Sequence, residues 1–228
     1  MKRRLRVAIS AVILSVTFTT LFGANNTLLA VNTLDITQTI NAGALATDVR
    51  DAGLVSVTSP SFGLSALTFS FNCAASTGVL GSDSQRIYVD NPGAADGGWT
   101  LTVAATDGAT TNWQNTGATA SFDFNDPTSS GCTDGADTDL FGGQLGLNPS
   151  AGTLTADCAS CTTANITKGS ATAFSQGSTD SITLLTAAAG SDDSGRWYLT
   201  DVTANQTIPA QQTVSNYSIN LTITATAS

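Results

Sequence analysis

The sequence predicts an all-β protein, an antiparallel β-sandwich in a single domain with a long loop insertion rich in Cys and Asp. The composition lacks the best helix formers, because Glu is absent and Lys168 is the only Lys beyond residue 6. Ser, Thr, Gly, Ala, Asn and Val are abundant instead, a mixture typical of strands and turns. Short segments of alternating apolar and polar residues also recur along the chain, separated by turn-forming residues.

The chain begins with a predicted secretory signal. The uncharged apolar run 7–22 follows four basic residues, Lys2, Arg3, Arg4 and Arg6. This run has the length of a signal-peptide core and is short for a membrane span. We therefore assign residues 1–30 to a signal peptide, cleaved between residues 24 and 30, and residues 31–228 to the mature domain. We expect a secreted protein of the cell surface, with no transmembrane segment after signal removal.

Alternation and turn residues predict the strands in order. The predicted strands are residues 33–40, 54–58, 66–72, 86–89, 99–105, 118–124, 144–147, 181–186, 196–199 and 217–226. In the last of them apolar side chains alternate with polar ones, so one face is expected to be buried and the other wet. Residues 42–52 are predicted to form a short helix or an irregular link. Residues from about 125 to 180 form the predicted insertion, because they are the least regular part.

The charge of the mature chain restricts its partners. All 17 acidic residues are Asp and lie beyond the signal, whereas four basic residues remain there, so the mature net charge is about −13. Nucleic acids and anionic lipids need Lys and Arg to neutralise phosphates. We therefore expect neither class of partner.

Four cysteines in an exported chain predict two structural disulfides, formed by Cys73, Cys132, Cys158 and Cys161. The C-A-S-C sequence at residues 158–161 could also belong to a zinc or redox site. A zinc ribbon would need a second such pair, and a thioredoxin site would need a βαβ context. Among the three pairings we favour Cys132 with Cys158 or Cys161, which would hold the acidic loop in place.

The sequence offers little for catalysis. Because His is absent, Ser-His-Asp and Cys-His arrangements and His-metal sites are excluded. Acid–base chemistry would depend on paired aspartates, as in an enzyme acting on glycans. No carboxylate pair on separate predicted strands is recognisable. We therefore expect a protein that is not an enzyme.

An acidic loop at residues 121–143, SFDFNDPTSSGCTDGADTDLFGG, is the strongest local pattern. Calcium takes six to eight oxygen ligands, which Asp and Asn on a glycine-rich loop can supply. The candidate ligands form two groups that could close on one ion: Asp123, Asn125 and Asp126, then Asp134, Asp137 and Asp139. The loop does not match an EF-hand, since Pro127 interrupts it and no bidentate Glu exists. The alternative is a solvated acidic loop held by a disulfide.

Three tryptophans are candidates for sugar contacts. Trp99 and Trp197 lie in alternating apolar strands and are expected in the core. Trp113 lies among polar residues in TTNWQNTG, which makes it the better candidate for an exposed contact.

Two segments resemble the WxL-domain family of surface proteins. In RIYVDNPGAADGGWTLTVAATD, a V-x-D and glycines precede a G-W-x-L strand, as in the family's proximal motif; the matching positions are Val89, Asp90, Gly93, Gly98, Trp99 and Leu101. The C-terminal IPAQQTVSNYSINLTITATAS is similar to the family's last strand at Ile208, Pro209, Tyr217 and Leu221. Residues 223–225 read I-T-A where the distal W-x-L would stand, and a W-x-L occurs instead at residues 197–199.

The resemblance implies a bacterial β-sandwich that is exported and associates non-covalently with a cell-wall polymer such as peptidoglycan. Trp99 and Leu101 are the motif positions for this binding, and Trp113 is a further candidate contact. The alternative is a structural subunit of a surface filament or layer, whose partner is a copy of itself. In that case residues 33–40 would form a strand that pairs with a neighbour's open sheet edge.

Overall fold

The structure, a computed structural model of the 228-residue chain, describes residues 37–93, 97–135, 141–190 and 194–228. The predicted signal peptide and the first half of the predicted strand 33–40 lie outside the described residues. The chain divides into two units, Met1–Thr39 and Ile40–Ser228, and the fold below is that of the second. No helix in the described ranges is long and apolar enough to cross a membrane.

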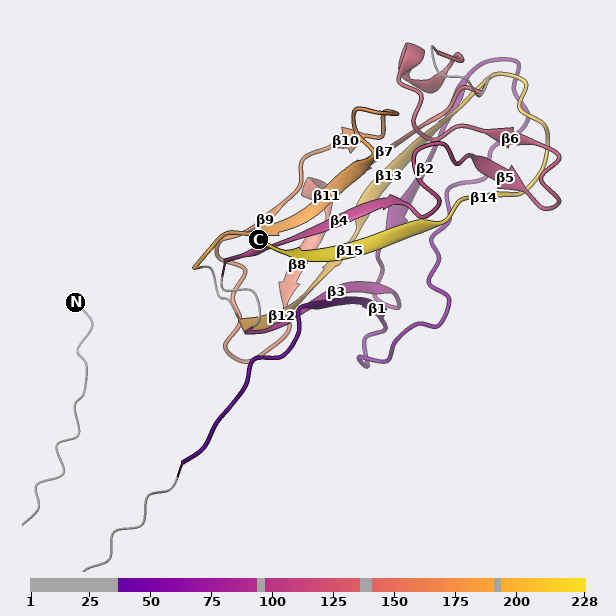
Figure 1. Cartoon of the computed structure of the whole chain (residues 1–228). Helices are drawn as coiled ribbons and strands as arrows, with labels where there is room; N and C mark the ends of the chain where they lie inside the picture. Colours follow the sequence, from indigo (N-terminus) through magenta and orange to yellow (C-terminus); the bar gives the residue numbers. More distant parts are fainter. Residues whose placement is uncertain (1–36, 94–96, 136–140, 191–193) are drawn as a thin grey trace, which may run out of the picture. The chain divides into compact units, whose positions relative to one another are not determined.

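The unit Ile40–Ser228 is an all-β sandwich with antiparallel pairing, as predicted (Figure 1). Its strands are β1 (Ala46–Arg50), β2 (Ala74–Leu80), β3 (Arg86–Pro92), β4 (Trp99–Ala105), β5 (Trp113–Asn115), β6 (Ser121–Phe122), β7 (Gln144–Asn148), β8 (Thr153–Ala156), β9 (Ile166–Lys168), β10 (Thr172–Ala173), β11 (Ser181–Ala187), β12 (Ser194–Thr200), β13 (Val202–Ile208), β14 (Tyr217–Ser218) and β15 (Leu221–Ala227). Two 3-10 turns, η1 (Thr128–Gly131) and η2 (Pro149–Ala151), complete the elements of the described ranges.

One layer consists of two sheets joined end to end, with strand orders β1-β3-β12-β8 and β10-β7-β13-β2. Asp201 alone separates β12 from β13, and its φ of 60° puts a kink in an otherwise continuous strand. The hairpin β2–β3 lies along one side of this strand, since Leu80 pairs with Val202 and Ile87 with Leu199. β7 and β8 follow the other side. The kinked strand β12–β13 therefore ties both ends of the layer together.

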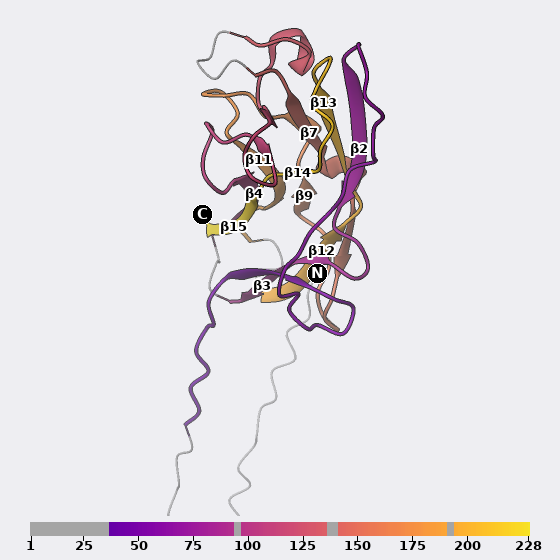
Figure 2. The ribbon, with the colours of Figure 1, turned by 90° about the vertical axis from the view of Figure 1, so that its right-hand side faces the viewer.

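The second layer has the order β15-β4-β11-β9 and is continued at one end by β14-β5-β6 (Figure 2). β4 shows why the layers pack: its side chains are alternately buried and half-buried, with Trp99, Leu101 and Val103 facing inward. The Trp99 ring lies 5.8 Å from that of Trp197 on β12, across the sandwich. Both tryptophans are fully buried, as the sequence predicted. Large apolar side chains from both layers thus form one core.

Several predicted strands are confirmed, and others are wrong. β3, β4, β7, β11 and β12 lie where strands were predicted. Residues 54–58 and 66–72 are not strands, and the described residues 37–40 belong to none. Their apolar side chains stay exposed, as at Val55 and Phe71, because no neighbouring strand covers them. Alternation alone was therefore not sufficient evidence for a strand.

Residues 42–52 and 125–180 also differ from the prediction. β1 occupies part of the predicted link, because it pairs with β3 over five residues. The predicted insertion contains β7, β8, β9 and β10, which belong to the two layers of the sandwich. The predicted strand 118–124 shortens to β6 after a turn at Ala118, whose φ is 51°. The predicted strand 217–226 is divided into β14 and β15.

Candidate functional site

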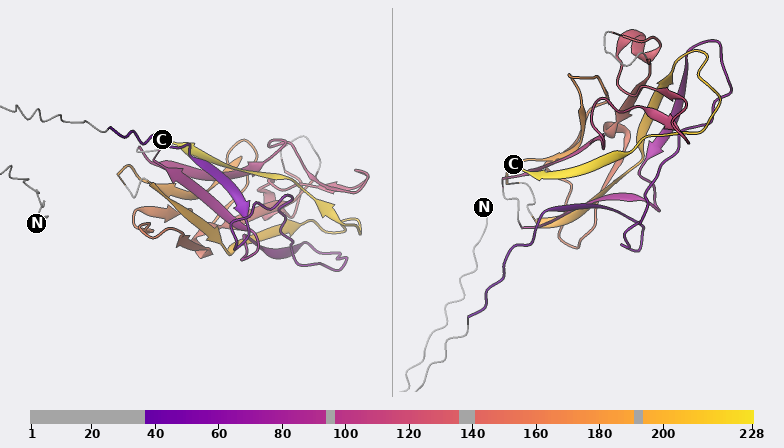
Figure 3. Two further views of the ribbon diagram at one scale, coloured as in Figure 1. Left: turned by 90° about the horizontal axis from the view of Figure 1, so that it is seen from below. Right: turned by 45° about the vertical axis from the view of Figure 1, so that its right-hand side comes forward.

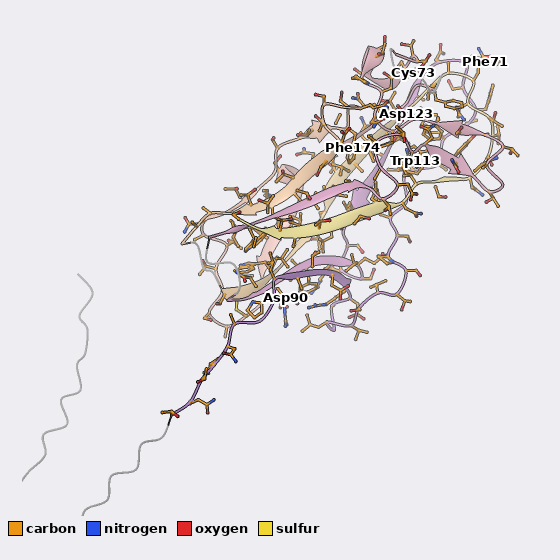
Figure 4. The ribbon with its side chains drawn as sticks, in the orientation of Figure 1. Phe71, Cys73, Asp90, Trp113, Asp123 and Phe174 are labelled. Atoms are coloured by element: carbon orange, nitrogen blue, oxygen red, sulfur yellow. A yellow bond between two sulfur atoms is a disulfide. The ribbon has the colours of Figure 1, made fainter. Side chains whose placement is uncertain are left out.

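The acidic loop begins at β6 and returns to the sandwich at β7. Its two ends are tied together, because Asp123 N–H donates to the Gly142 carbonyl (2.9 Å) and Asp126 N–H to that of Gly143 (3.0 Å). Gly143 has φ of 142°, and a Cβ there would collide with the Asp123 carbonyl. Only glycine allows this close approach of the two strands. Figure 4 places Asp123 near Trp113 and Cys73, at the end of the sandwich opposite Asp90.

The first group of predicted calcium ligands is buried. Asp123 and Asp126 are each 1% exposed and Asn125 is fully buried. One oxygen of Asp126 accepts from the Thr128 N–H (2.8 Å), and the Asn125 amide donates to the Ala109 carbonyl (2.9 Å). The other oxygens, Asp126 Oδ2 and Asn125 Oδ1, are buried without a hydrogen-bond partner. A buried polar atom without a partner costs about 1–3 kcal/mol, so a ligand or water that bonded these oxygens would stabilise the fold.

The second group of predicted ligands does not join the first in the described part of the chain. Asp134 is exposed, and no three acidic or cysteine side chains among the described residues gather closely enough to hold a metal ion. Asp137 and Asp139 lie outside the described residues. Asp123, Asp126 and Asp134 therefore do not form the expected cluster by themselves. Asn125 and Asp126 are predicted ligands that each keep one buried oxygen without a hydrogen-bond partner.

The two disulfides are present with a different pairing from the one we favoured. Cys73 is bonded to Cys132 (Cα–Cα 5.5 Å) and Cys158 to Cys161 (Cα–Cα 5.2 Å). The favoured pairing of Cys132 with Cys158 or Cys161 is wrong, because β7, η2 and β8 lie between them and carry the chain along the sandwich. The acidic loop is held instead to the segment that enters β2.

The motif residues that carry the family resemblance have structural roles. Trp99 and Leu101 are in the core and are not accessible to a polymer. Asp90 accepts from Arg50 Nη2 and Arg196 Nε, both at 2.7 Å, and so joins β1, β3 and β12. Burial acts to lower the pKa of Arg50, but its hydrogen bonds to Asp90 and Asp48 raise that pKa above the ordinary value. The motif thus builds the sandwich rather than an exposed surface.

Trp113, the candidate for an exposed contact, is half-buried. Its ring stacks on Phe122 (5.7 Å between centroids), and Phe122 meets Tyr217 edge-on at 4.9 Å. The indole N–H donates to Oε1 of the buried Gln206 (2.8 Å). Trp113 also lines a groove along the side of the sandwich.

This groove, of about 460 Å³, was missed by the sequence analysis. It lies between the β14–β15 edge of one layer and the β1, β2 and β3 side of the other. Apolar side chains predominate in its lining, which includes Val49, Phe62, Leu80, Ile87, Val103, Trp113, Tyr217, Ile219, Leu221 and Ile223. No motif marks it, but the alternation of the predicted last strand, residues 217–226, contributes four of these side chains.

β15 borders the groove and is an edge strand. It pairs with β4 along its whole length and has no second neighbour in its sheet among the described residues (Figure 3, right). Its inward side chains Leu221, Ile223 and Ala225 are only half-buried. The groove is therefore the open side of the sandwich, where the core lacks a covering strand.

A second apolar surface lies at the end of the sandwich. Phe69 and Phe71 contact each other edge-on at 5.2 Å and are both exposed. The loop that holds them accepts a hydrogen bond at Ser70 from Gln211 N–H (2.8 Å), close to the exposed Val214.

Comparisons of the chain with protein-family models, with curated proteins and with solved structures found no match. The resemblance to WxL-domain proteins therefore rests on the motif residues alone.

Proposed function

We propose that the chain is an exported, non-catalytic cell-surface protein that assembles with copies of itself as a structural subunit of a filament or layer. The observation that carries the proposal is the open side of the sandwich. The half-buried inward side chains of β15 adjoin an apolar groove. In addition, the apolar side chain of Ile40, in the segment before β1, is 90% exposed. An unpaired edge and an exposed apolar segment in one chain favour association by strand pairing.

The non-catalytic part of the proposal is supported by composition and by the position of the acidic groups. The chain has neither His nor Glu, so proton transfer would depend on Asp. Asp123 and Asp126 are buried and accept hydrogen bonds from neighbouring backbone N–H groups of Phe124 and Thr128. Such contacts suit a structural role in shaping the loop.

Sedimentation velocity of the processed, oxidised protein over a hundredfold concentration range tests the assembly. We expect species larger than the monomer at the higher concentrations, and elongated or layered particles by electron microscopy. A monomer at every concentration, with and without millimolar calcium, would contradict the proposal.

Association with peptidoglycan is a second candidate function, supported by the family resemblance. Since Trp99 and Leu101 are buried, a sugar chain would have to contact Trp113 through the groove. Co-sedimentation with purified peptidoglycan tests this, with Trp113→Ala as the variant. We expect at least about a tenfold loss for Trp113→Ala, which corresponds to about 1.4 kcal/mol. Wild-type protein that stays in the supernatant would exclude wall binding.

We also propose that calcium stabilises the acidic loop. Asn125 Oδ1 and Asp126 Oδ2 are oxygen donors of the kind calcium prefers, and both lack a hydrogen-bond partner. An ion that binds only the folded chain adds about 2.7 kcal/mol at a hundred times its Kd.

Thermal unfolding in EDTA and then in millimolar calcium measures this effect. We expect calcium to raise the Tm by several degrees, and Asp126→Asn to remove the increase. Asp107→Asn, in an exposed turn, is the matched control and should leave the increase unchanged. Equal Tm values in EDTA and calcium would show that calcium does not stabilise the loop, which the Cys73–Cys132 disulfide and its backbone hydrogen bonds would then hold without an ion.

A further inference from the structure

We infer that residues 33–40 of one copy pair with the free edge of β15 in a second copy and place their apolar side chains in the groove. This inference rests on the proposed self-assembly and specifies both partners of the contact. The acceptor is β15 with its groove. The donor, hereafter the arm, is the alternating segment 33–40.

The acceptor edge lacks the features that normally keep sheet edges apart. Edge strands are usually protected by charged residues, proline, a bulge or a covering segment. Residues 217–228 contain no charged side chain and no proline, and the outward face of β15 consists of Thr222, Thr224 and Thr226. The seven-residue pairing with β4 has no register shift. An uncharged edge of this length without a register shift is suited to accept another strand.

β1, on the other side of the groove, is a weaker candidate acceptor. Backbone hydrogen bonds to residues 55–57 already occupy the outer side of β1 at one end. Val57 N–H donates to the Val49 carbonyl (2.9 Å), and Asp51 N–H donates to the Val55 carbonyl (3.0 Å). β15 is thus the longer free edge beside the groove.

The arm matches the acceptor in pattern, length and charge. Leu34, Ile36 and Ile40 share one face of an extended strand, as the inward side chains of β15 do. The arm has eight residues, and Leu221–Ala227 has seven. Residues 31–47 carry only one charged side chain, Asp35, in a chain whose mature charge is about −13. Contact between arm and β15 therefore adds little repulsion between two acidic copies.

The backbone before β1 favours a second copy over the arm's own groove. Gly43 N–H donates to the Pro92 carbonyl (3.0 Å), which continues the β1–β3 pairing beyond the Ala46–Asp90 pair. A side chain at Gly43 would collide with the Pro92 ring, so the chain lies close against the end of β3. The segment before β1, indigo in Figure 1, thus lies against the end of β3 around Gly43.

Cross-linking between two single-cysteine variants tests the contact. Gln38→Cys protein is mixed with Thr224→Cys protein, both with their native disulfides intact, and treated with a short thiol-to-thiol cross-linker. Thr167→Cys replaces Thr224→Cys in the control, because Thr167 is an equally exposed threonine on β9, the other edge of the same sheet. We expect dimer with Thr224→Cys and at least about tenfold less with Thr167→Cys.

Charge substitutions in the arm give a second measurement. Ile36→Asp should weaken assembly at least about tenfold, because it places a carboxylate in an apolar groove. Thr37→Asp, on the opposite face of the same arm, should weaken it less. Neither residue lies in the folded unit Ile40–Ser228, so both variants should keep the wild-type Tm of the monomer.

The outcomes separate this inference from the proposed function. If Ile36→Asp protein still assembles, or if Thr167→Cys cross-links as much as Thr224→Cys, the arm contact is overturned. The proposed self-assembly would not be affected by either result. A strictly monomeric wild type overturns both. A double variant, Gln38→Cys with Thr224→Cys, can be cross-linked at concentrations where the protein is monomeric. A cross-link within one chain would show that the arm binds the groove of its own chain, and it would also overturn the inference.

Discussion

β4 and β15 are neighbours in one sheet and have the same alternating pattern, yet they differ in burial. They pair residue by residue from Ala105–Leu221 to Trp99–Ala227. The inward side chains of β4 are at most 1% exposed at Trp99, Leu101 and Val103, whereas those of β15 are half-buried. β4 has a second neighbour, β11, and β15 has none in the described part of the sheet. Alternation thus selects the inward face, and a second neighbouring strand decides whether that face is covered.

The largest predicted effect is on β4. Trp99→Ala should lower the free energy of unfolding by about 3–5 kcal/mol, because it removes a fully buried ring that contacts Trp197. Urea unfolding monitored by far-UV circular dichroism measures the change. A loss of unfolding free energy below about 1 kcal/mol would mean that the sandwich does not depend on the contact between Trp99 and Trp197.

Ile223→Ala makes the corresponding change on β15. The monomer should lose only about 1 kcal/mol, because the side chain is half-buried and so contributes about half of a full burial energy. The same variant should weaken assembly more than it weakens folding, since Ile223 lines the groove. Urea unfolding at low concentration and sedimentation at high concentration separate the two effects. A loss as large as that of Trp99→Ala would show that β15 is already covered.

The smallest effect is expected on β1, at the other side of the groove. Burial acts to raise the pKa of Asp48, but hydrogen bonds from Ser56 and Arg50 outweigh it and hold this pKa below the ordinary 3.8. The ionised carboxylate therefore stabilises the fold above pH 3.8, and this contribution is lost as the pH falls through the lowered pKa.

Asp48→Asn should therefore flatten the dependence of the unfolding free energy on pH below about 3.8. Urea unfolding at several pH values between 2 and 6 gives the slope. Asp107→Asn, in an exposed turn, is the control and should retain the wild-type slope. Identical slopes for all three proteins would show that the Asp48 contacts do not persist in solution.

The sequence predicted those parts of the fold where alternation and burial coincide. The strand around Trp99 was found because its apolar side chains alternate without interruption. β13 was missed because Gln206 occupies one of its inward positions, where its side chain accepts from Trp113 and donates to the Asp123 carbonyl. A buried polar residue of this kind interrupts the apolar pattern, and only its tertiary partners explain it.

The candidate sites were predicted less well than the fold. The buried group around Asp126 lies within the acidic loop, as the composition indicated. The groove depends on which strands remain unpaired, and the disulfide pairing depends on how β7 and β8 carry the chain along the sandwich. Both are properties of topology, which a single sequence does not state. They became visible only with the strand order.

The order β15-β4-β11 has a kinetic consequence. The Thr106 and Thr222 hydroxyl groups, 2.8 Å apart, are separated by 116 residues, so β15 can join β4 only after a long loop closes. Until then β4 is itself an edge, for which the arm of another molecule would compete in the proposed assembly. Loop closure within one chain does not depend on concentration, whereas capture by a neighbour does. Refolding at low concentration should therefore favour monomers with a completed sheet, and crowded refolding should trap molecules in which a foreign arm occupies the place of β15.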